Sequence, residues 1–181
     1  MIRHLYDQTV SLDGEWELFW ASHEELRKRG ECDKKDVTLS TPRLCTRVAL
    51  EAGGFAHMTT TVPNNFELSL FRAGLCEDPY FGTHTVEMQK YEVMHQFYTC
   101  RFAKPKEIDG WVLRFAEIDT AAEVFLNGER ILECENMFLC HEADTIADGR
   151  GERVGCAYQT RNDLCARFGN RCDVCRPALQ L

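Results

Sequence analysis

The feature that most constrains this fold is an Asn-Gly pair between two short runs of strand-forming residues. Residues 121–126 and 129–132 are rich in apolar side chains, and Asn127 and Gly128 lie between them. Both residue types tolerate the positive φ angles that a two-residue type I′ turn requires. The pattern therefore predicts a β-hairpin and fixes which residues of its two strands face each other.

Further short strands with turn signals between them are expected in the first 145 residues. In the first strand, Trp16, Leu18 and Trp20 alternate with Glu15 and Glu17, which predicts one buried and one wetter face. Other strands are expected near residues 96–102, 111–115, 122–126 and 129–134. Short strands separated by turns are typical of a β-sandwich.

One or two short surface helices interrupt this pattern. Ser22 precedes a helical stretch, and Glu25 follows three residues later, as in a capping box. A second helix is expected over residues 66–72, where Asn64 or Asn65 can cap the first turn. The sequence therefore predicts an all-β fold with little helix.

Composition excludes several classes of protein. The chain has 181 residues, the size of one domain with a substantial core. Its net charge of −8 disfavours binding to nucleic-acid phosphates or anionic membrane surfaces. No run approaches the roughly 18 apolar residues of a transmembrane helix, and residues 1–7 lack the apolar region of a secretory signal. We expect a cytoplasmic protein with neither a membrane nor a nucleic-acid partner.

The ten cysteines are expected to be free thiols, since a reducing compartment disfavours disulfides. Cys100 shares a predicted strand face with Tyr98 and Phe102, and Cys134 shares one with Leu132. A buried thiol behaves as a small hydrophobic group. We therefore interpret the six cysteines before residue 145 as structural or incidental, and we expect no cofactor.

Several motifs occur in the order and spacing of a known family. In chain order, they lie at residues 11–18 (SLDGEWEL), 62–68 (VPNNFEL), 72–75 (RAGL), 78–82 (DPYFG), 111–115 (WVLRF), 119–128 (DTAAEVFLNG) and 136–138 (NMF). This set resembles the N-terminal sugar-binding domain of glycoside hydrolase family 2 and is most similar to its β-mannosidase branch. The resemblance covers residues 11–144.

The resemblance implies a galactose-binding-like jelly-roll β-sandwich over residues 1–145. In the complete enzymes of this family, an immunoglobulin-like domain and a (β/α)8 barrel follow, and the barrel holds two catalytic glutamates, one of them in an Asn-Glu pair. A retaining glycosidase needs two carboxyl groups about 5 Å apart. This chain is too short for the barrel and contains no Asn-Glu dipeptide. We therefore expect no catalytic residue here and no hydrolysis by the chain alone.

Jelly-roll modules bind sugars by stacking an aromatic ring on the apolar sugar face while polar side chains form directed hydrogen bonds. The candidate substrate-binding residues are Asp78, Tyr80, Phe81, His84 and Asn136. A structural alternative exists for most of them. The two aromatic rings would anchor their loop to the core, Asp78 would cap a turn, and Asn136 would satisfy backbone groups.

The pattern changes after residue 145. Residues 146–181 contain six arginines, no lysine and four of the ten cysteines, and they carry a formal charge of +2 against −10 for residues 1–145. No long alternating apolar run is present. We interpret this tail as either unstructured or the product of a shifted reading frame or an annotation junction. Cys172 and Cys175 form a Cys-x-x-Cys pair, but zinc sites favour two such pairs, so no metal is expected.

The sequence thus predicts the sugar-binding domain, as a fragment, of a β-mannosidase-like retaining glycoside hydrolase. Its expected partners are a β-linked glycoside and the catalytic barrel domain that this chain lacks. The alternative is a stand-alone, non-catalytic module that binds carbohydrate or protein in its own right.

Overall fold

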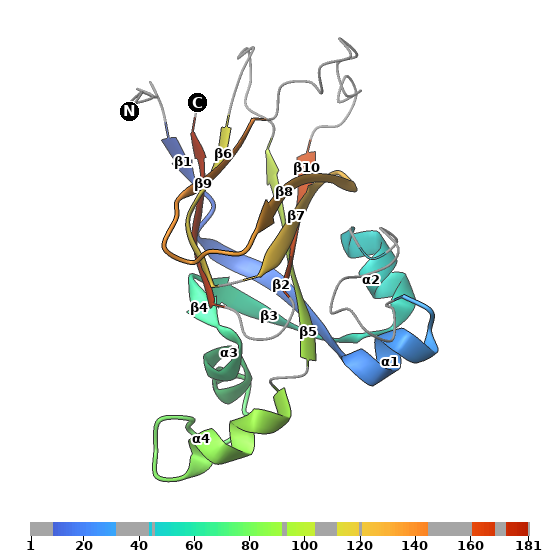
Figure 1. Cartoon of the computed structure of the whole chain (residues 1–181), viewed down its shortest axis with the longest axis vertical. Coiled ribbons are helices and arrows are strands. Elements are labelled where there is room, and N and C mark those ends of the chain that lie inside the picture. Colours follow the sequence, from blue (N-terminus) through green and yellow to red (C-terminus); the bar gives the residue numbers. More distant parts are fainter. Residues whose placement is uncertain are drawn as a thin grey trace.

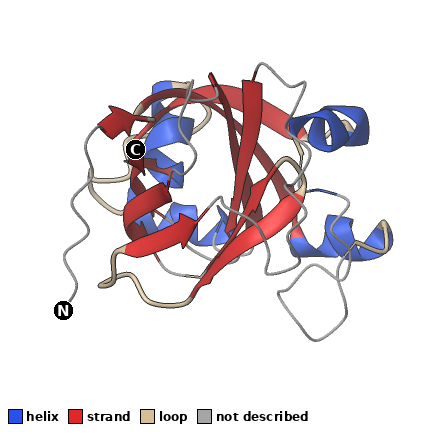
Figure 2. Ribbon diagram, turned by 90° about the horizontal axis from the view of Figure 1, so that it is seen from above, coloured by secondary structure: helices blue, strands red, loops and turns tan. Residues whose placement is uncertain are grey.

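Two antiparallel β-sheets form a sandwich in the computed structural model, which describes residues 9–31, 44, 46–91, 94–103, 112–119, 121–144, 161–168 and 173–180 (Figures 1 and 2). The larger sheet has the order β3 (Ala56–Val62), β2 (Gly14–Ser22), β5 (Met94–Ala103), β10 (Arg161–Phe168), β7 (Ala122–Leu126) and β8 (Glu129–Cys134). The smaller sheet has the order β1 (Thr9–Ser11), β11 (Asp173–Gln180), β6 (Val112–Asp119) and β9 (His141–Asp144), with β4 (Asn64–Asn65) beside β11. The all-β prediction is confirmed.

The main core lies between the two sheets and contains the predicted alternating residues. Trp16 and Leu18 of β2 pack with Tyr98 of β5 and with Leu113 and Phe115 of β6, and all five are at most 2% exposed. Full burial of each such side chain contributes roughly 1.5–3 kcal/mol. This core fixes the strand register, because a slip of one residue would turn these side chains towards solvent.

The Asn-Gly hairpin is confirmed. Strands β7 and β8 pair antiparallel, and the turn residues Asn127 and Gly128 have φ angles of 52° and 89°. Positive φ at both positions is the requirement that selects Asn-Gly for such a turn. The register shifts between Val124 and Phe125, which leaves Ile131 as the extra residue of a bulge on β8.

The second face of β2 is more buried than the sequence predicted. Phe19 and Ala21 lie on this face, and helices α1 (His23–Lys28) and α2 (Arg47–Gly53) cover them with Leu26 and Leu50. Only the Glu15 and Glu17 end of this face remains wetter. Local alternation could not show this, because a helix that covers the sheet comes from a different part of the sequence.

Helix α1 follows the predicted cap, whereas α2 was not predicted. The Ser22 hydroxyl accepts a hydrogen bond from the Glu25 backbone N–H at 3.1 Å. The Thr46 hydroxyl caps α2 in the same way through the Ala49 N–H at 3.3 Å.

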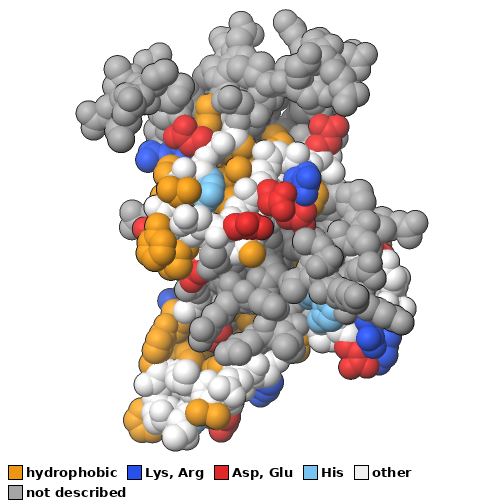
Figure 3. Space-filling model, viewed as in Figure 1, with side chains coloured by type: hydrophobic (Ala, Val, Ile, Leu, Met, Phe, Trp, Pro, Cys, Tyr) orange, Lys and Arg blue, Asp and Glu red, His pale blue; other side chains and the backbone are white. Residues whose placement is uncertain are grey.

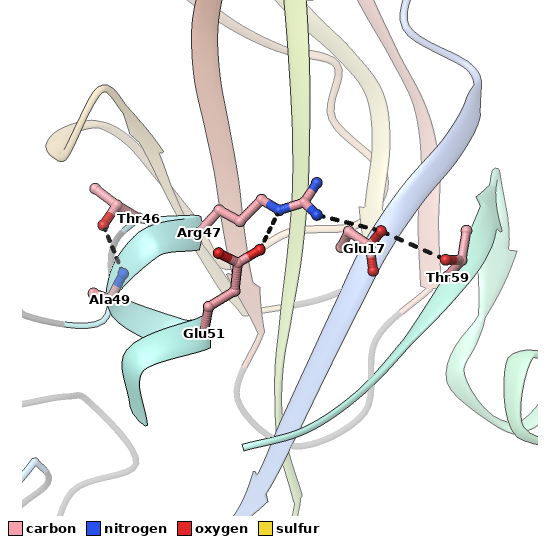
Figure 4. A network of polar contacts seen from close by, with 6 residues as sticks. All are labelled: Glu17, Thr46, Arg47, Ala49, Glu51 and Thr59. Carbon is pink, nitrogen blue, oxygen red and sulfur yellow. Dashed lines mark hydrogen bonds and ion pairs between the residues drawn. The ribbon is translucent and has the colours of Figure 1, made fainter. Parts of the chain in front are cut away.

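Arg47 ties α2 to the larger sheet (Figure 4). Its guanidinium lies 2.7 Å from the Glu51 carboxylate and 3.5 Å from that of Glu17 on β2. Thr59 of the neighbouring strand β3 donates to Glu17 at 3.5 Å. The ion pairs are partly exposed, so they orient the helix more than they stabilise it.

Helix α3 (Phe66–Arg72) agrees with the prediction, including its cap. The Asn65 side chain accepts from the Leu68 N–H at 2.8 Å, while Phe66 and Leu70 are buried in the main core. Helix α4 (His84–Glu87) and the 3₁₀-helix η2 (Met88–Tyr91) follow and lead into β5. The described residues thus contain more short helices than the one or two expected.

The expectation of an unstructured tail does not hold for residues 161–168 and 173–180, which form β10 and β11. Strand β10 pairs with β5 on one side and with β7 on the other, and β11 lies between β1 and β6. Strand pairing uses backbone N–H and C=O groups, which nearly every residue carries. The lack of an alternating apolar pattern therefore did not exclude these two strands.

Candidate functional site

The loop that carries four of the five candidate residues follows α3. Helix α3 ends at Arg72, and Gly74 follows its cap with a φ angle of 70°, which lets the Leu75 N–H turn back to the Leu70 carbonyl at 2.9 Å. The chain then reaches Asp78, whose carboxylate accepts from the Tyr80 N–H at 2.9 Å. The structural alternative for Asp78, a side chain that caps a turn, matches this contact.

Tyr80 and Phe81 do not anchor the loop to the core. Their side chains are 74% and 71% exposed, whereas the preceding Pro79 is buried. The loop is held by backbone acceptors instead, since Thr85 Oγ1 donates to the Pro79 carbonyl at 2.8 Å. Two adjacent exposed aromatic rings are unusual without a binding role.

His84 is held in one tautomer by the loop backbone. Its Nδ1 lies 3.0 Å from the carbonyl oxygen of Asp78. A carbonyl oxygen only accepts, so Nδ1 carries the proton and Nε2 of the neutral ring is a hydrogen-bond acceptor. The His84 and Phe81 ring centroids lie 6.0 Å apart. The apolar ring of Phe81 therefore lies beside His84, whose Nε2 is a hydrogen-bond acceptor.

Asn65 connects this loop to helix α3. Its Nδ2 donates to the Tyr80 hydroxyl at 3.3 Å, while its Oδ1 caps the helix. The tyrosine hydroxyl can still donate its own proton to a ligand. Sequence analysis identified Asn65 as a cap and missed this second contact, which only the fold brings about.

Asn136 lies apart from the loop. Its side chain accepts from the Phe138 N–H at 2.9 Å, and its carbonyl contacts His141 Nε2 at 3.0 Å. These contacts agree with the structural alternative. Figure 1 shows the β8–β9 loop apart from the loop between α3 and α4. The structure thus groups Asp78, Tyr80, Phe81 and His84 and leaves Asn136 outside this group.

The β8–β9 loop exposes apolar side chains of its own. Met137, Phe138 and Leu139 are 36%, 87% and 53% exposed. Phe71, Leu75 and Val86 are also exposed near the candidate loop. Figure 3 shows orange side chains over the α3–α4 end of the molecule and over the β8–β9 loop on the same flank.

The described carboxylates show ion pairing of the ordinary surface kind. Lys28 lowers the pKa of Glu24, and Arg47 lowers that of Glu51. A glycosidase general acid needs a raised pKa instead. Among the residues with described side chains, no three His, Cys, Asp or Glu residues are placed to hold a metal ion. Cys172 lies outside the described residues, and for Cys175 only the backbone of β11 is described.

The two-sheet fold defines a galactose-binding-like β-sandwich domain. The chain belongs to the family described as the glycosyl hydrolase 2 galactose-binding domain-like family, whose sequence model matches residues 40–152. This membership confirms the fold class and the family that the motifs predicted.

β-Mannosidases are among the relatives. The chain is 38% identical to Beta-mannosidase B of Thermothelomyces thermophilus over 87 residues, which cover 47% of this chain and 10% of that protein. It also superposes on the crystal structure of a β-D-mannosidase from Dictyoglomus thermophilum with a TM-score of 0.61 at 26% identity, covering 90% of this chain and 16% of that one.

A more distant neighbour, a Ruminococcus gnavus β-glucuronidase with a TM-score of 0.54 and 20% identity, shares the fold. That match covers 93% of this chain and 22% of the other. The chain therefore spans about a tenth of the curated β-mannosidase and less than a quarter of either solved structure. Its described residues form the sandwich domain and contain no (β/α)8 barrel. None of their helices has the length and apolar character needed to cross a membrane.

Proposed function

We propose that this chain is the sugar-binding domain of a β-mannosidase-like retaining glycoside hydrolase whose catalytic barrel lies outside it. The exposed pair Tyr80 and Phe81 beside the oriented His84 carries this proposal. Phe81 provides an apolar face for a pyranose ring, and His84 Nε2 accepts from a sugar hydroxyl. Asp78 positions the loop, and Asn136 contributes at most a separate contact.

The exposed apolar side chains near α3 and on the β8–β9 loop support the same proposal. Large apolar patches on soluble proteins commonly mark interfaces. We propose that the catalytic barrel covers part of this surface and brings a β-linked glycoside against the candidate loop. The chain alone then binds the sugar weakly and does not hydrolyse it.

Titration with methyl β-D-mannopyranoside, followed by NMR, tests the binding site. Phe81→Ala should weaken binding roughly two- to tenfold, because an aromatic stack contributes about 0.5–1.5 kcal/mol beyond its buried area. Val86→Ala is the matched control, since Val86 is 63% exposed and lies close in the sequence. Equal affinities of the wild type and Phe81→Ala would contradict the proposal. Hydrolysis of p-nitrophenyl β-D-mannopyranoside by the chain alone would also contradict it.

The alternative proposal is a stand-alone module that binds carbohydrate or protein without a barrel. It predicts a monomer whose sugar affinity does not increase when a family 2 barrel from a β-mannosidase is added. The exposed aromatic and aliphatic side chains favour the first proposal, because they would remain in water in a solitary module.

We also propose that the chain divides at residue 145, with residues 1–145 as the sugar-binding-like unit and residues 146–181 as an atypical tail. The change in lysine use and charge supports this division. The nucleotide sequence of the locus, read in three forward frames beyond the codon for Asp144, tests it. A second frame that continues into a barrel with an Asn-Glu pair would support the proposal, and its absence would refute it.

A cytoplasmic location is proposed on the basis of the free thiols. Among the described residues, Cys76, Cys134 and Cys140 are free cysteines. Free thiols persist in reducing compartments. Fractionation of cells that express the tagged chain would test this location.

A further inference from the structure

The outer edge of strand β3 differs from the other sheet edges of this molecule. Strand β3 pairs with β2 on one side, and no described segment pairs with its other side. It is seven residues long, with the sequence AHMTTTV, and contains neither Asp, Glu, Lys, Arg nor Pro. An unpaired strand edge presents alternate N–H and C=O groups that can bind another strand.

The remaining edges carry the features that normally prevent such pairing. Strand β8 at the opposite edge of the larger sheet has Glu129, Arg130 and Glu133 among its six residues, and it contains the bulge at Ile131. In the smaller sheet, β1 has three residues, and β9 has four, with the sequence HEAD. Short length, charge and bulges protect edges from association. Among the described strand edges, β3 alone combines length with the lack of charge.

From this contrast we infer that β3 is a self-association edge, on which a second copy of this chain adds its own β3 antiparallel. The two six-stranded sheets would then become one continuous sheet related by a two-fold axis. This inference concerns an interface between copies and does not depend on carbohydrate binding.

The sequence of β3 selects one register for this pairing. His57, Thr59 and Thr61 are exposed on the outer face, whereas Thr60 and Val62 point towards the core. Antiparallel partners must share a face, because a slip of one residue exchanges the two faces. The register with Thr59 opposite Thr59 satisfies this condition and uses all seven residues. It places His57 opposite Thr61, so no like charges are opposed.

Neighbouring charges also permit the pairing. Glu17 lies opposite Thr59 on β2, and its carboxylate is paired with Arg47. Across the proposed interface, the two copies of Glu17 would be separated by three strand spacings, or about 14 Å. This distance exceeds the Debye length of about 8 Å at physiological salt, so their repulsion is screened.

Sedimentation velocity of the full 181-residue chain over a concentration series tests the inference. Thr59→Lys places two lysines opposite each other at the two-fold axis and should raise the dimer Kd at least about tenfold, a change of about 1.4 kcal/mol. Val48→Lys is the matched control, because it adds the same charge at a 59% exposed position on α2. If Thr59→Lys fails to fold by circular dichroism, Thr61→Lys takes its place.

Two results would overturn the inference. One is a wild-type chain that stays monomeric throughout the series. The other is a dimer that persists in Thr59→Lys and in Thr61→Lys but is lost when Tyr80→Ala and Phe81→Ala are combined. That result would locate the interface at the aromatic loop. Hydrogen exchange that slows with protein concentration at β3 amides, and not at β8 amides, would support the β3 edge directly.

Discussion

Deletion of residues 146–181 should abolish cooperative folding if β10 lies where the structure places it. Strand β10 forms eight cross-strand residue pairs with β5 and five with β7. An antiparallel ladder averages about one hydrogen bond per pair, and each contributes about 1 kcal/mol net. The deletion therefore removes on the order of 10 kcal/mol, comparable with the whole stability of a domain, about 5–15 kcal/mol. It would also leave the inner edges of β5 and β7 unpaired.

A point substitution tests the same placement in the full-length chain. Ala166 of β10 lies between Tyr98 of β5 and Val124 of β7. Ala166→Pro removes an N–H from a central strand, and an acceptor left without its donor costs about 1–3 kcal/mol. For a chain of this size, the melting temperature should fall by roughly 2–12 °C. Ala166→Ser keeps the N–H and is the control.

Thermal and urea unfolding, followed by far-UV circular dichroism, would measure both changes. The reasoning would be refuted if residues 1–145 alone melted cooperatively at the wild-type temperature and Ala166→Pro had no effect. That result would mean that the sandwich is complete without β10, and it would favour a foreign origin of the tail.

Four further predictions concern individual side chains. Gln96 is 3% exposed, and its Oε1 has no hydrogen-bond partner among the described residues. Gln96→Met should therefore stabilise the fold by about 1–3 kcal/mol in urea denaturation, and equal or lower stability would contradict this. Asn65→Ala should cost about 0.5–2 kcal/mol in the same assay through loss of the α3 cap, whereas Asn65→Asp, which keeps the cap, should cost less. Burial raises the pKa of the Cys134 thiol from 9.0 to about 11. The unfolded chain therefore loses this proton at lower pH than the folded chain, and the free energy of unfolding should decline as the pH rises from about 9 to 11. Cys134→Ala should lack this decline. In thiol labelling of the native protein at pH 8, the exposed Cys140 should react before Cys134, and the reverse order would count against the burial argument.

Much of the fold could be predicted from local sequence because its signals are local. The Asn127-Gly128 turn, the Ser22 and Asn65 caps and the alternation around Trp16 each depend on residues a few positions apart. The predicted strands 122–126 and 129–134 coincide with β7 and β8. Helix α2 was missed, although Thr46 gave a capping signal that could have identified its start.

The candidate site could be predicted only in part. Local turn chemistry correctly suggested that Asp78 caps its own turn. The structural alternative in which Tyr80 and Phe81 anchor their loop to the core was wrong, because whether a ring meets the core depends on the direction in which α3 carries the loop. The contact between Asn65 and Tyr80 joins residues fifteen positions apart and has no local signature.

The sequence by itself determined the family, the hairpin register and the helix caps, because these depend on short-range geometry and on motifs in order. Only the tertiary structure decided which side chains share a site and which strand edges remain unpaired. It separated Asn136 from the aromatic loop, placed Asn65 beside Tyr80 and left β3 with one edge that no described segment pairs. The physical reason is that strand pairing and helix packing join distant segments through backbone hydrogen bonds and core burial, which local patterns do not specify.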